Sequence, residues 1–344
     1  MSEDASAVSV IMAVCNGEKF LQDAVESVLK QSVDDFEFLI IDDGSTDGSG
    51  EILENFSKKD SRVRLIRQKN IGLTKSLNIG LRHARGEFIA RMDGDDLCFP
   101  NRFATQLDFL RQNPDVVACG SNVELIDSDG DRIGVYRRPQ THEEIEEHFW
   151  SGLAGAIVHP SAMIRTDALK KIGGYNERFS KCQDYDLWFR LAEIGRLANV
   201  SEVLLQWRQH ANSICYQSSD VQFVLAQEIY FDAARRRGLD IANLPPKVNF
   251  VRQNSWDCHV EWAKFALHEQ NFRTARKHAK MAFERMPRNS PDYREMCTIQ
   301  NGSLILKFLL KQMTGRVYWL LVKISRRLKS SFRNGISSLE MLFA

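Results

Sequence analysis

The sequence predicts an α/β fold, with a mostly parallel sheet flanked by helices and an α-helical C-terminal extension. Three observations predict it. Short apolar runs alternate with stretches of helical periodicity through the first hundred residues. Polar or acidic residues follow several of these runs directly. Beyond residue 243 the alternation stops and helical spacing dominates.

The first strand is predicted at Val8–Val14, a β-branched apolar run that ends at Cys15-Asn16-Gly17. From Phe20 to Leu29 apolar residues recur at helical spacing, which predicts an amphipathic helix. Strands separated by helices indicate crossover connections and parallel pairing. The alternation continues with strands at 36–41, 63–68 and 88–92 and helices at 49–58 and 103–112.

Ligands of such sheets collect beyond the carboxyl ends of the strands. Cys15-Asn16, Asp42-Asp43 and residues 93–96 each follow a predicted strand, so we expect them on one rim. Asp93 and Asp95 would then share a hard divalent cation, which prefers oxygen ligands. A solvated turn with helix-capping carboxylates explains the same cluster equally well from sequence alone.

A second carboxylate, Asp184, begins a stretch with helical spacing. It is either a charge in the first turn of a helix or a general base, with Asp186 as the alternative base. His210 is a candidate metal ligand because imidazole suits Mn²⁺. A hydrogen-bonded structural histidine is the alternative for His210 and is favoured for His159.

Six segments match a family pattern in order and spacing. Over roughly residues 8–215, the chain resembles family 2 glycosyltransferases of the Rossmann-like GT-A fold. The resemblance implies a metal-dependent, inverting enzyme that moves one sugar from a nucleoside-diphosphate sugar, first of all a UDP-sugar, to the hydroxyl of a glycan or lipid-linked acceptor. Bacterial surface-polysaccharide synthesis is the implied setting. The segments are 8–32, 39–47, 70–80, 86–101, 159–175 and 183–191.

The resemblance also implies a role for each matching position. Asp43 would hydrogen-bond the base, Lys75 would face the diphosphate, and Asp184 takes the place of the catalytic base. The cation, Mn²⁺ or Mg²⁺, would be held by Asp93, Asp95 and His210. The positions expected to bind the nucleotide sugar are Ala13, Cys15, Asn16, Glu18, Asp43, Lys75, Asp93 and Gly94.

The sequence departs from the family pattern at three positions. Ala13 replaces the usual proline, Cys15 replaces a tyrosine that could stack on the base, and Gln183 replaces a glutamate. Nucleotide preference is therefore open, and the neutral Gln183 should leave Asp184 with a lower proton affinity than a second carboxylate would. Residues 206–208 lack the arrangement of polymerising relatives, which favours a single addition.

Composition limits the remaining function classes. Lys plus Arg total 46 against 45 Asp plus Glu, so the whole chain has no net field that would collect nucleic acid. Seven scattered cysteines show no zinc or redox spacing and favour reduced thiols and a cytoplasmic location. Residues 1–7 show no secretory pattern, so export is not expected.

We expect three regions: a catalytic domain over 1–243, a helical hairpin resembling one tetratricopeptide repeat over 244–300, and a basic amphipathic tail over 301–344. The tail has eight Lys and Arg residues and one acid, Glu340. Its longest uncharged apolar run, 317–322, is far shorter than the ~20 residues that span a bilayer. It is expected to lie on the anionic inner face of the cell membrane, with a dimerising or core-packed helix as the alternative.

Two other functions stay open. A sugar nucleotidyltransferase would use a similar sheet and metal, but it normally has a glycine-rich, arginine-containing loop after the first strand, which Cys15-Asn16-Gly17-Glu18 is not. A catalytically silent nucleotide-binding scaffold of a polysaccharide assembly complex would keep the fold without turnover.

Overall fold

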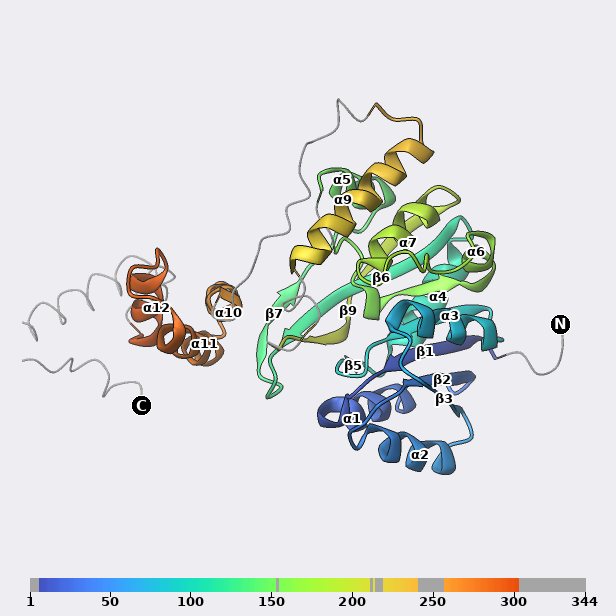
Figure 1. Cartoon of the computed structure of the whole chain (residues 1–344), viewed down its shortest axis with the longest axis horizontal. Coiled ribbons are helices and arrows are strands. Elements are labelled where there is room, and N and C mark those ends of the chain that lie inside the picture. The colour runs from blue at the N-terminus through green and yellow to red at the C-terminus, as the bar shows by residue number, and fades with distance from the viewer. Residues whose placement is uncertain (1–5, 153–154, 211–212, 214–218, 241–256, 303–344) are drawn as a thin grey trace, which may run out of the picture. The chain divides into compact units, whose positions relative to one another are not determined.

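The structure is a computed structural model and describes residues 6–152, 155–210, 213, 219–240 and 257–302. The chain divides into two compact units, Met1–Cys258 and His259–Ala344. The first unit contains a sheet covered by helices on both faces (Figure 1). The boundary predicted at 243/244 and nearly all of the predicted tail lie outside the described residues.

The sheet has nine strands, in the order β3-β2-β1-β4-β8-β6-β9-β5, with β7 paired to β6. The pairs β1–β2, β1–β4, β2–β3 and β6–β9 are parallel, whereas β8, β7 and β5 pair antiparallel. The predicted parallel sheet is therefore present in the first half of the unit, and the second half is mixed. The strands are β1 (Val8–Val14), β2 (Phe36–Asp43), β3 (Val63–Gln68), β4 (Phe88–Met92), β5 (Leu97–Cys98), β6 (Val116–Ile126), β7 (Arg132–Tyr136), β8 (Met163–Arg165) and β9 (Arg196–Arg208).

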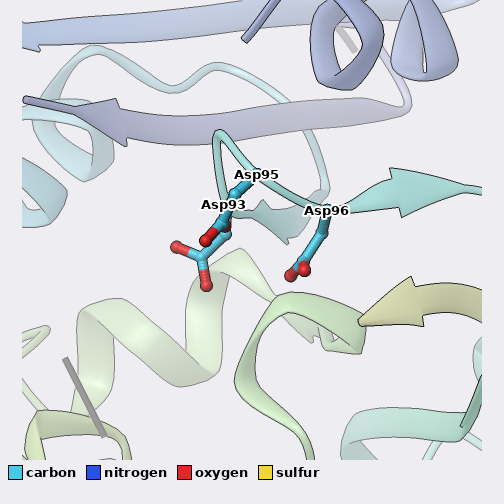
Figure 2. A group of neighbouring side chains, drawn as sticks. All are labelled: Asp93, Asp95 and Asp96. Atoms are coloured by element: carbon cyan, nitrogen blue, oxygen red, sulfur yellow. The ribbon is translucent and has the colours of Figure 1, made fainter. Parts of the chain in front are cut away.

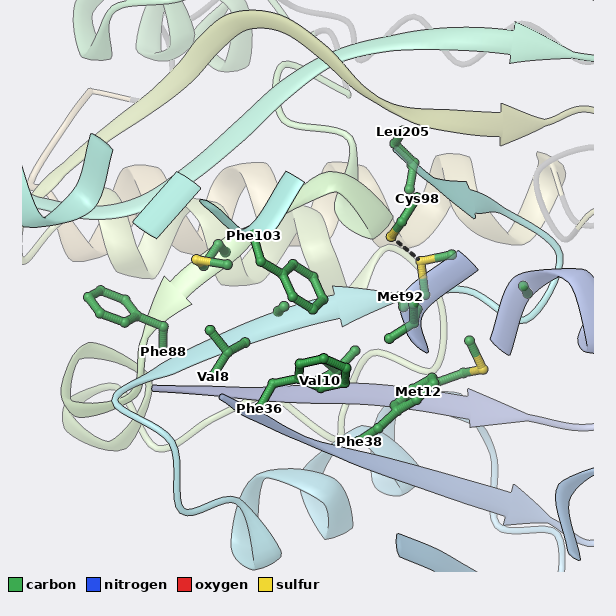
Figure 3. Packing of buried hydrophobic residues seen from close by; sticks show 14 of the residues in the cluster. Val8, Val10, Met12, Phe36, Phe38, Phe88, Met92, Cys98, Phe103 and Leu205 are labelled. Atoms are coloured by element: carbon green, nitrogen blue, oxygen red, sulfur yellow. Dashed lines mark hydrogen bonds between the residues drawn. The ribbon is translucent and has the colours of Figure 1, made fainter. Parts of the chain in front are cut away.

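Two apolar layers form because side chains alternate across each strand. Val10 and Met12 of β1 pack with the helices on one face, whereas Ile11 packs on the other. Figure 3 shows the first layer, where the rings of Phe36 and Phe103 meet edge to face at 5.5 Å. Helices of the first layer are α1 (Glu18–Leu29), α2 (Ser49–Lys59) and α4 (Arg102–Gln112). Those of the second are α3 (Leu73–His83), α5 (His142–Trp150), α6 (Thr166–Lys171), α7 (Gln183–Ala192) and α9 (Ser219–Arg236).

Strand register places the predicted polar segments on one rim. Val14 of β1 lies opposite Asp42 of β2, and Met12 lies opposite Met92 of β4. The three parallel strands therefore end together, and their carboxyl ends deliver Cys15, Asp43 and Asp93 to the same edge. This confirms the expectation drawn from the strand ends in the sequence.

The second unit contains α10 (Asp257–His268), α11 (Phe272–Arg285) and α12 (Tyr293–Gln300). The first two confirm the predicted helical pair, and Ala263, Ala275 and Ala282 are fully buried. Such small side chains permit close packing of helices. α12 has no counterpart in the sequence prediction. Among the described residues, no helix is both long and apolar enough to cross a membrane.

A pair of Gly→Ala substitutions tests the tight contact between β1 and the chain entering β4. A Cβ at Gly86 would come within 2.4 Å of the backbone nitrogen of Ser9, whereas a Cβ at Gly50 in α2 meets atoms at 3.5 Å or more. We expect Gly86→Ala to lower the free energy of unfolding by about 1–3 kcal/mol, as overpacking does. Gly50→Ala, in the first turn of α2, should raise it by about 0.4–1 kcal/mol, because alanine has fewer conformations than glycine in the unfolded chain. Urea unfolding of the two variants measures both, and equal stability at Gly86→Ala would contradict the close approach.

Candidate active site

A cavity of about 390 Å³ opens at the carboxyl ends of β1, β2 and β4. It brings together eight of the residues predicted from the sequence and adds apolar and aromatic wall residues. Within the described part of the chain, Glu18, Lys75 and Asp184 do not line it. The lining residues are Ala13, Val14, Cys15, Asn16, Gly17, Lys19, Phe20, Asp43, Leu73, Asp93, Gly94, Asp95, His210 and Ser213.

The turn after β1 is held by Asn16. Its backbone φ angle is 57°, in the left-handed region that asparagine tolerates better than most residues. Its Oδ1 accepts a hydrogen bond of 2.8 Å from the Thr46 amide, and its own amide donates to the Ser45 Oγ at 3.1 Å. Glu18 accepts from the Gly48 amide at 3.0 Å. Both side chains thus fasten the turn after β1 to the turn after β2.

Asp43 is buried and orders the loop before α3. Its Oδ1 accepts hydrogen bonds from Gln68 Nε2 at 2.8 Å and from the Ile71 amide at 2.9 Å. Its Oδ2 accepts from the Gly72 amide at 2.9 Å. A carboxylate offers about four acceptor positions, so Oδ2 retains capacity for one further donor on the cavity side.

The acidic turn after β4 crowds three carboxylates together. Asp93, Asp95 and Asp96 each offer an oxygen within 4.8 Å of the others (Figure 2). Asp96 is buried; its Oδ1 accepts from the Arg208 amide at 2.8 Å, and its Oδ2 has no hydrogen-bond partner among the described residues. Burial, together with the charges of Asp95 and Asp93, raises the pKa of Asp96 well above its usual value. A buried oxygen without a donor, beside two further carboxylates, fits a hard divalent cation.

His210 lies at the same cluster. Its Nε2 is 3.0 Å from Asp95 Oδ2, and its ring is 5.4 Å from that of Phe20. The Asp95 carboxylate is about one-third exposed, at 34%, and faces the cavity. Asp95 and His210 therefore meet at the cavity, and this contact fits both a hydrogen-bonded histidine and a pair of ligands, so their role as metal ligands stays a prediction.

Arg91 supplies the fixed positive charge beneath this cluster. It is buried at 3% exposure and forms an ion pair with the Asp93 carboxylate. Burial alone would lower the pKa of Arg91, but the charge and hydrogen bond of Asp93 outweigh burial and raise it. Burial also raises the pKa of Asp93, which Arg91 opposes. Arg91 thus stays charged where three carboxylates need compensation.

Two further arginines fix the backbone of the acidic turn. The Arg208 Nε donates to the Asp95 carbonyl at 2.8 Å, and its guanidinium lies 4.5 Å from the centre of the Phe20 ring. Arg102 is buried and donates to the Arg91 carbonyl at 2.9 Å. Sequence reasoning missed Arg91, Arg208 and Asp96 as site residues. The position of Asp96 within the acidic run was the only sequence signal for any of them.

Asp184 lies in the first turn of α7 and is half-buried. The pKa of Asp184 is raised, mainly by burial and also by the charge of Asp93. A hydrogen bond from the Tyr185 amide and the charge of Arg91 lower this pKa but do not cancel the rise. These electrostatic interactions put Asp184 in the neighbourhood of the acidic turn. The alternative, Asp186, is 1% exposed and accepts from the Arg190 Nε at 2.7 Å, so its carboxylate is already engaged in an ion pair.

His159 and Lys75 are placed differently. His159 is buried, and its Nε2 lies 2.7 Å from the Tyr175 hydroxyl. Burial and the nearby Arg91 lower the pKa of His159 well below its usual value. The buried contact with Tyr175 fits the hydrogen-bonded structural histidine favoured by the sequence. Lys75 is exposed on α3. Its predicted contact with a diphosphate stays a prediction.

A second acidic group, Asp127, Asp129 and Asp131, lies at the hairpin between β6 and β7. The Asp127 Oδ1 accepts from the amides of Asp129 and Asp131 at 2.9 and 3.0 Å. These bonds shape the turn, and we assign this carboxylate that structural role.

The family model for glycosyl transferase family 2 matches residues 9–173. An uncharacterised glycosyltransferase of Methanocaldococcus jannaschii is 34% identical over 211 residues, covering 60% of this chain and 71% of that protein. The putative glycosyltransferase EpsE of Bacillus subtilis is 34% identical over 241 residues, covering 69% and 84%. The chain belongs to glycosyltransferase family 2. The O-antigen biosynthesis glycosyltransferase WbnJ of Escherichia coli is 32% identical over 210 residues, covering 60% and 81%.

Solved structures of this family share the fold of the chain. Staphylococcus aureus TarS 1–349 in complex with UDP-GlcNAc aligns with a TM-score of 0.53 at 16% identity, covering 86% of this chain and 87% of that one. The mannosyltransferase PcManGT from Pyrobaculum calidifontis, in complex with GDP-Man and Mn²⁺, aligns with a TM-score of 0.52 at 16% identity, covering 90% and 89%. This family 2 glycosyltransferase therefore has the predicted GT-A fold, with additional C-terminal helices.

Removing the Arg91 charge should destabilise the protein. Arg91→Met leaves the half-buried carboxylate of Asp93 and the buried carboxylate of Asp96 without their fixed cation. Breaking a fully buried pair typically costs about 3–5 kcal/mol, and we expect a smaller loss here because Asp93 is partly exposed. Urea unfolding at neutral pH measures the loss. Arg91→Met combined with Asp93→Asn should recover part of it, because the second change removes one of the uncompensated charges. Equal stability of Arg91→Met and the unsubstituted protein would contradict the role given to Arg91.

Proposed function

We propose that this enzyme transfers one sugar from a nucleoside-diphosphate sugar to an acceptor hydroxyl, with inversion at the anomeric carbon. The observation that carries the proposal is the single cavity shared by the turn after β1, the Asp43 carboxylate and the acidic turn. The turn after β1 and the Asp43 carboxylate would bind the nucleoside, and the acidic turn would bind the diphosphate through a cation. Membership of glycosyltransferase family 2 supports the reaction class.

The base of the donor would bind between Cys15 and Asp43. The remaining acceptor position of Asp43 Oδ2 suits an N–H group of a pyrimidine or purine. UDP is the first candidate, although Cys15 offers no aromatic plane for stacking. The described neighbours were solved with UDP-GlcNAc and with GDP-Man, so both nucleotides belong in a donor screen.

The residues fit a divalent cation, Mn²⁺ or Mg²⁺, held by Asp93, Asp95 and His210. When bound, it would act as a Lewis acid that stabilises negative charge on the leaving diphosphate. Arg91 would keep Asp93 oriented and partly compensated. Lys75 would add an electrostatic contribution if the diphosphate extends toward α3.

Asp184 would accept the proton of the acceptor hydroxyl. A hydroxyl is a poor nucleophile until its proton is removed, and a positioned base contributes about 10²- to 10⁴-fold. A single displacement by the activated hydroxyl inverts the anomeric centre. The ion pair of Asp186 with Arg190 leaves Asp184 as the available carboxylate on α7.

The acceptor would be a growing glycan or a lipid-linked sugar, in surface-polysaccharide synthesis at the inner face of the cell membrane. The similarity to WbnJ, a glycosyltransferase of O-antigen biosynthesis, supports this setting. We propose that 1–243 performs the chemistry and that 244–300 and 301–344 act as appendages. A sugar nucleotidyltransferase is disfavoured by the family match, and a silent scaffold is tested by turnover.

A donor screen tests the proposed function. Thermal unfolding with UDP- and GDP-sugars, with and without Mn²⁺, should reveal one donor that stabilises the protein, by about 2.7 kcal/mol when it is 100-fold above its Kd. The stabilised mixture should release nucleoside diphosphate when an acceptor is added. Asp95→Asn should lose the Mn²⁺-dependent part of the stabilisation. A donor that binds without any turnover across a broad acceptor panel would support the scaffold instead.

Asp184→Asn should lower kcat by about 10²- to 10⁴-fold while donor binding is retained. Because burial raises the pKa of Asp184 above 3.8, the base loses its charge at a higher pH than an exposed aspartate does. The rate of the unsubstituted enzyme should fall about tenfold per pH unit below that raised pKa. Asp186→Asn is the matched control: it should lower stability by disrupting the pair with Arg190 and leave turnover of the folded enzyme in place. Unchanged turnover in Asp184→Asn would remove this residue from the mechanism.

A further inference from the structure

The total charge of the chain is close to zero because its two units have large net charges of opposite sign. Residues 259–344 contain 16 Lys and Arg against six Asp and Glu, which makes the second unit basic by ten charges. Residues 1–258 contain 30 Lys and Arg against 39 Asp and Glu, which makes the first unit acidic by nine. An electric field of one sign therefore attracts one unit and repels the other.

Four of the eight Lys and Arg residues in 259–302 line one groove. This basic groove has a volume of about 470 Å³ and is lined by Arg273, Arg276, Lys277, Lys280, Gln300 and Asn301. The four basic residues recur at helical spacing on α11, so they share one face of the helix. The opposite face is buried through Ala275, Ala279 and Ala282.

Among the described residues, acidic side chains do little to compensate Arg273, Arg276 and Lys280. Lys280 Nζ lies 4.0 Å from Glu284, at the margin of an ion pair. Asp292 and Glu295 are directed to Lys264 instead, at 2.7 and 3.5 Å. Arg276 donates to the Gln300 carbonyl at 3.2 Å, a neutral partner.

This arrangement has a cost in the isolated protein. Arg273 with Lys277, and Arg276 with Lys280, are like-charged pairs four residues apart, which destabilise a helix. An anionic partner along the whole face would reverse the sign of that contribution. The row covers about 10 Å of helix, since seven residues rise 1.5 Å each. A single phosphate reaches only part of it, whereas a surface of many anionic groups compensates all of it.

We propose that the basic groove of α11 docks the enzyme on an anionic phospholipid surface. The sequence that follows the groove favours this partner. Residues 303–344 begin two positions after Asn301 and contain eight basic residues, one acidic residue and apolar residues at helical spacing. Lys and Arg near an anionic membrane each strengthen binding by about fivefold. The same surface repels the acidic first unit, so the contact with lipid is expected through the second unit. The inference stands without the proposed donor chemistry, because binding to lipid needs no turnover.

The test is cosedimentation of the full-length protein with phosphatidylcholine vesicles and with vesicles of equal phosphatidylcholine and phosphatidylglycerol. Arg273→Glu with Lys280→Glu reverses two charges in the groove. Arg288→Glu with Arg294→Glu makes the same charge change at exposed positions outside it. We expect the groove variant to lose about 30-fold or more in affinity for the anionic vesicles, since it removes two basic contacts and adds repulsion. The control should lose about fivefold at most. Binding of the unsubstituted protein should weaken as salt is raised.

Other outcomes overturn the proposal. Equal losses in the two variants would mean that net charge alone matters and that the groove is not the docking site. Equal binding to neutral and anionic vesicles would rule out charge recognition. An unchanged affinity of the groove variant for anionic vesicles, together with a change in molar mass by light scattering, would assign the groove to a second copy of the chain. Thermal unfolding of each variant establishes that it is folded, and nucleotide binding to the first unit keeps a failure here distinct from a failure of the proposed reaction.

Discussion

Three carboxylates held within 4.8 Å of one another are the constraint around which the rest of the site is arranged. Like charges at this distance repel strongly in a partly buried site, so the fold must compensate them. Arg91 compensates Asp93 through an ion pair, and the backbone amide of Arg208 donates a hydrogen bond to Asp96. The compensation is incomplete, because Asp96 Oδ2 still lacks a donor among the described residues. An incompletely compensated cluster of carboxylates has the chemistry that a hard cation prefers.

The surrounding strands and helices hold the acidic turn after β4 in place. β4 ends level with β1 and β2, so the acidic turn faces the cavity without a long loop. Arg102 anchors the carbonyl of Arg91 from α4, and β9 returns to the same turn through Arg208 and His210. Residues more than a hundred positions apart thereby hold the turn from two sides. Buried hydrogen bonds to charged groups are strong, which suits a site that must keep its geometry while charge develops.

The division of charge between the two units gives the chain a polarity that the total of +1 conceals. The acidic unit carries the cavity with its three carboxylates, and the basic unit carries the groove on α11. The like-charged pairs on α11 lower the stability of that helix. Repulsion among the carboxylates of Asp93, Asp95 and Asp96 lowers the stability of the acidic turn in the same way.

The sequence by itself determined β1 to β4 and helices α1, α2 and α4 of the first unit, the helical pair of the second, and the rim on which Cys15, Asp43 and Asp93 meet. These follow from periodicity and from the rule that parallel strands end together, both of which are local properties of the chain. Tertiary structure alone decided the antiparallel pairing of β8, the addition of α12, and the roles of Arg91, Arg208 and Asp96. Periodicity does not say which buried arginine faces which carboxylate, because that depends on strands brought together by β9 from far along the sequence. It also could not separate Asp184 from Asp186, since only packing shows that Arg190 already occupies one of them.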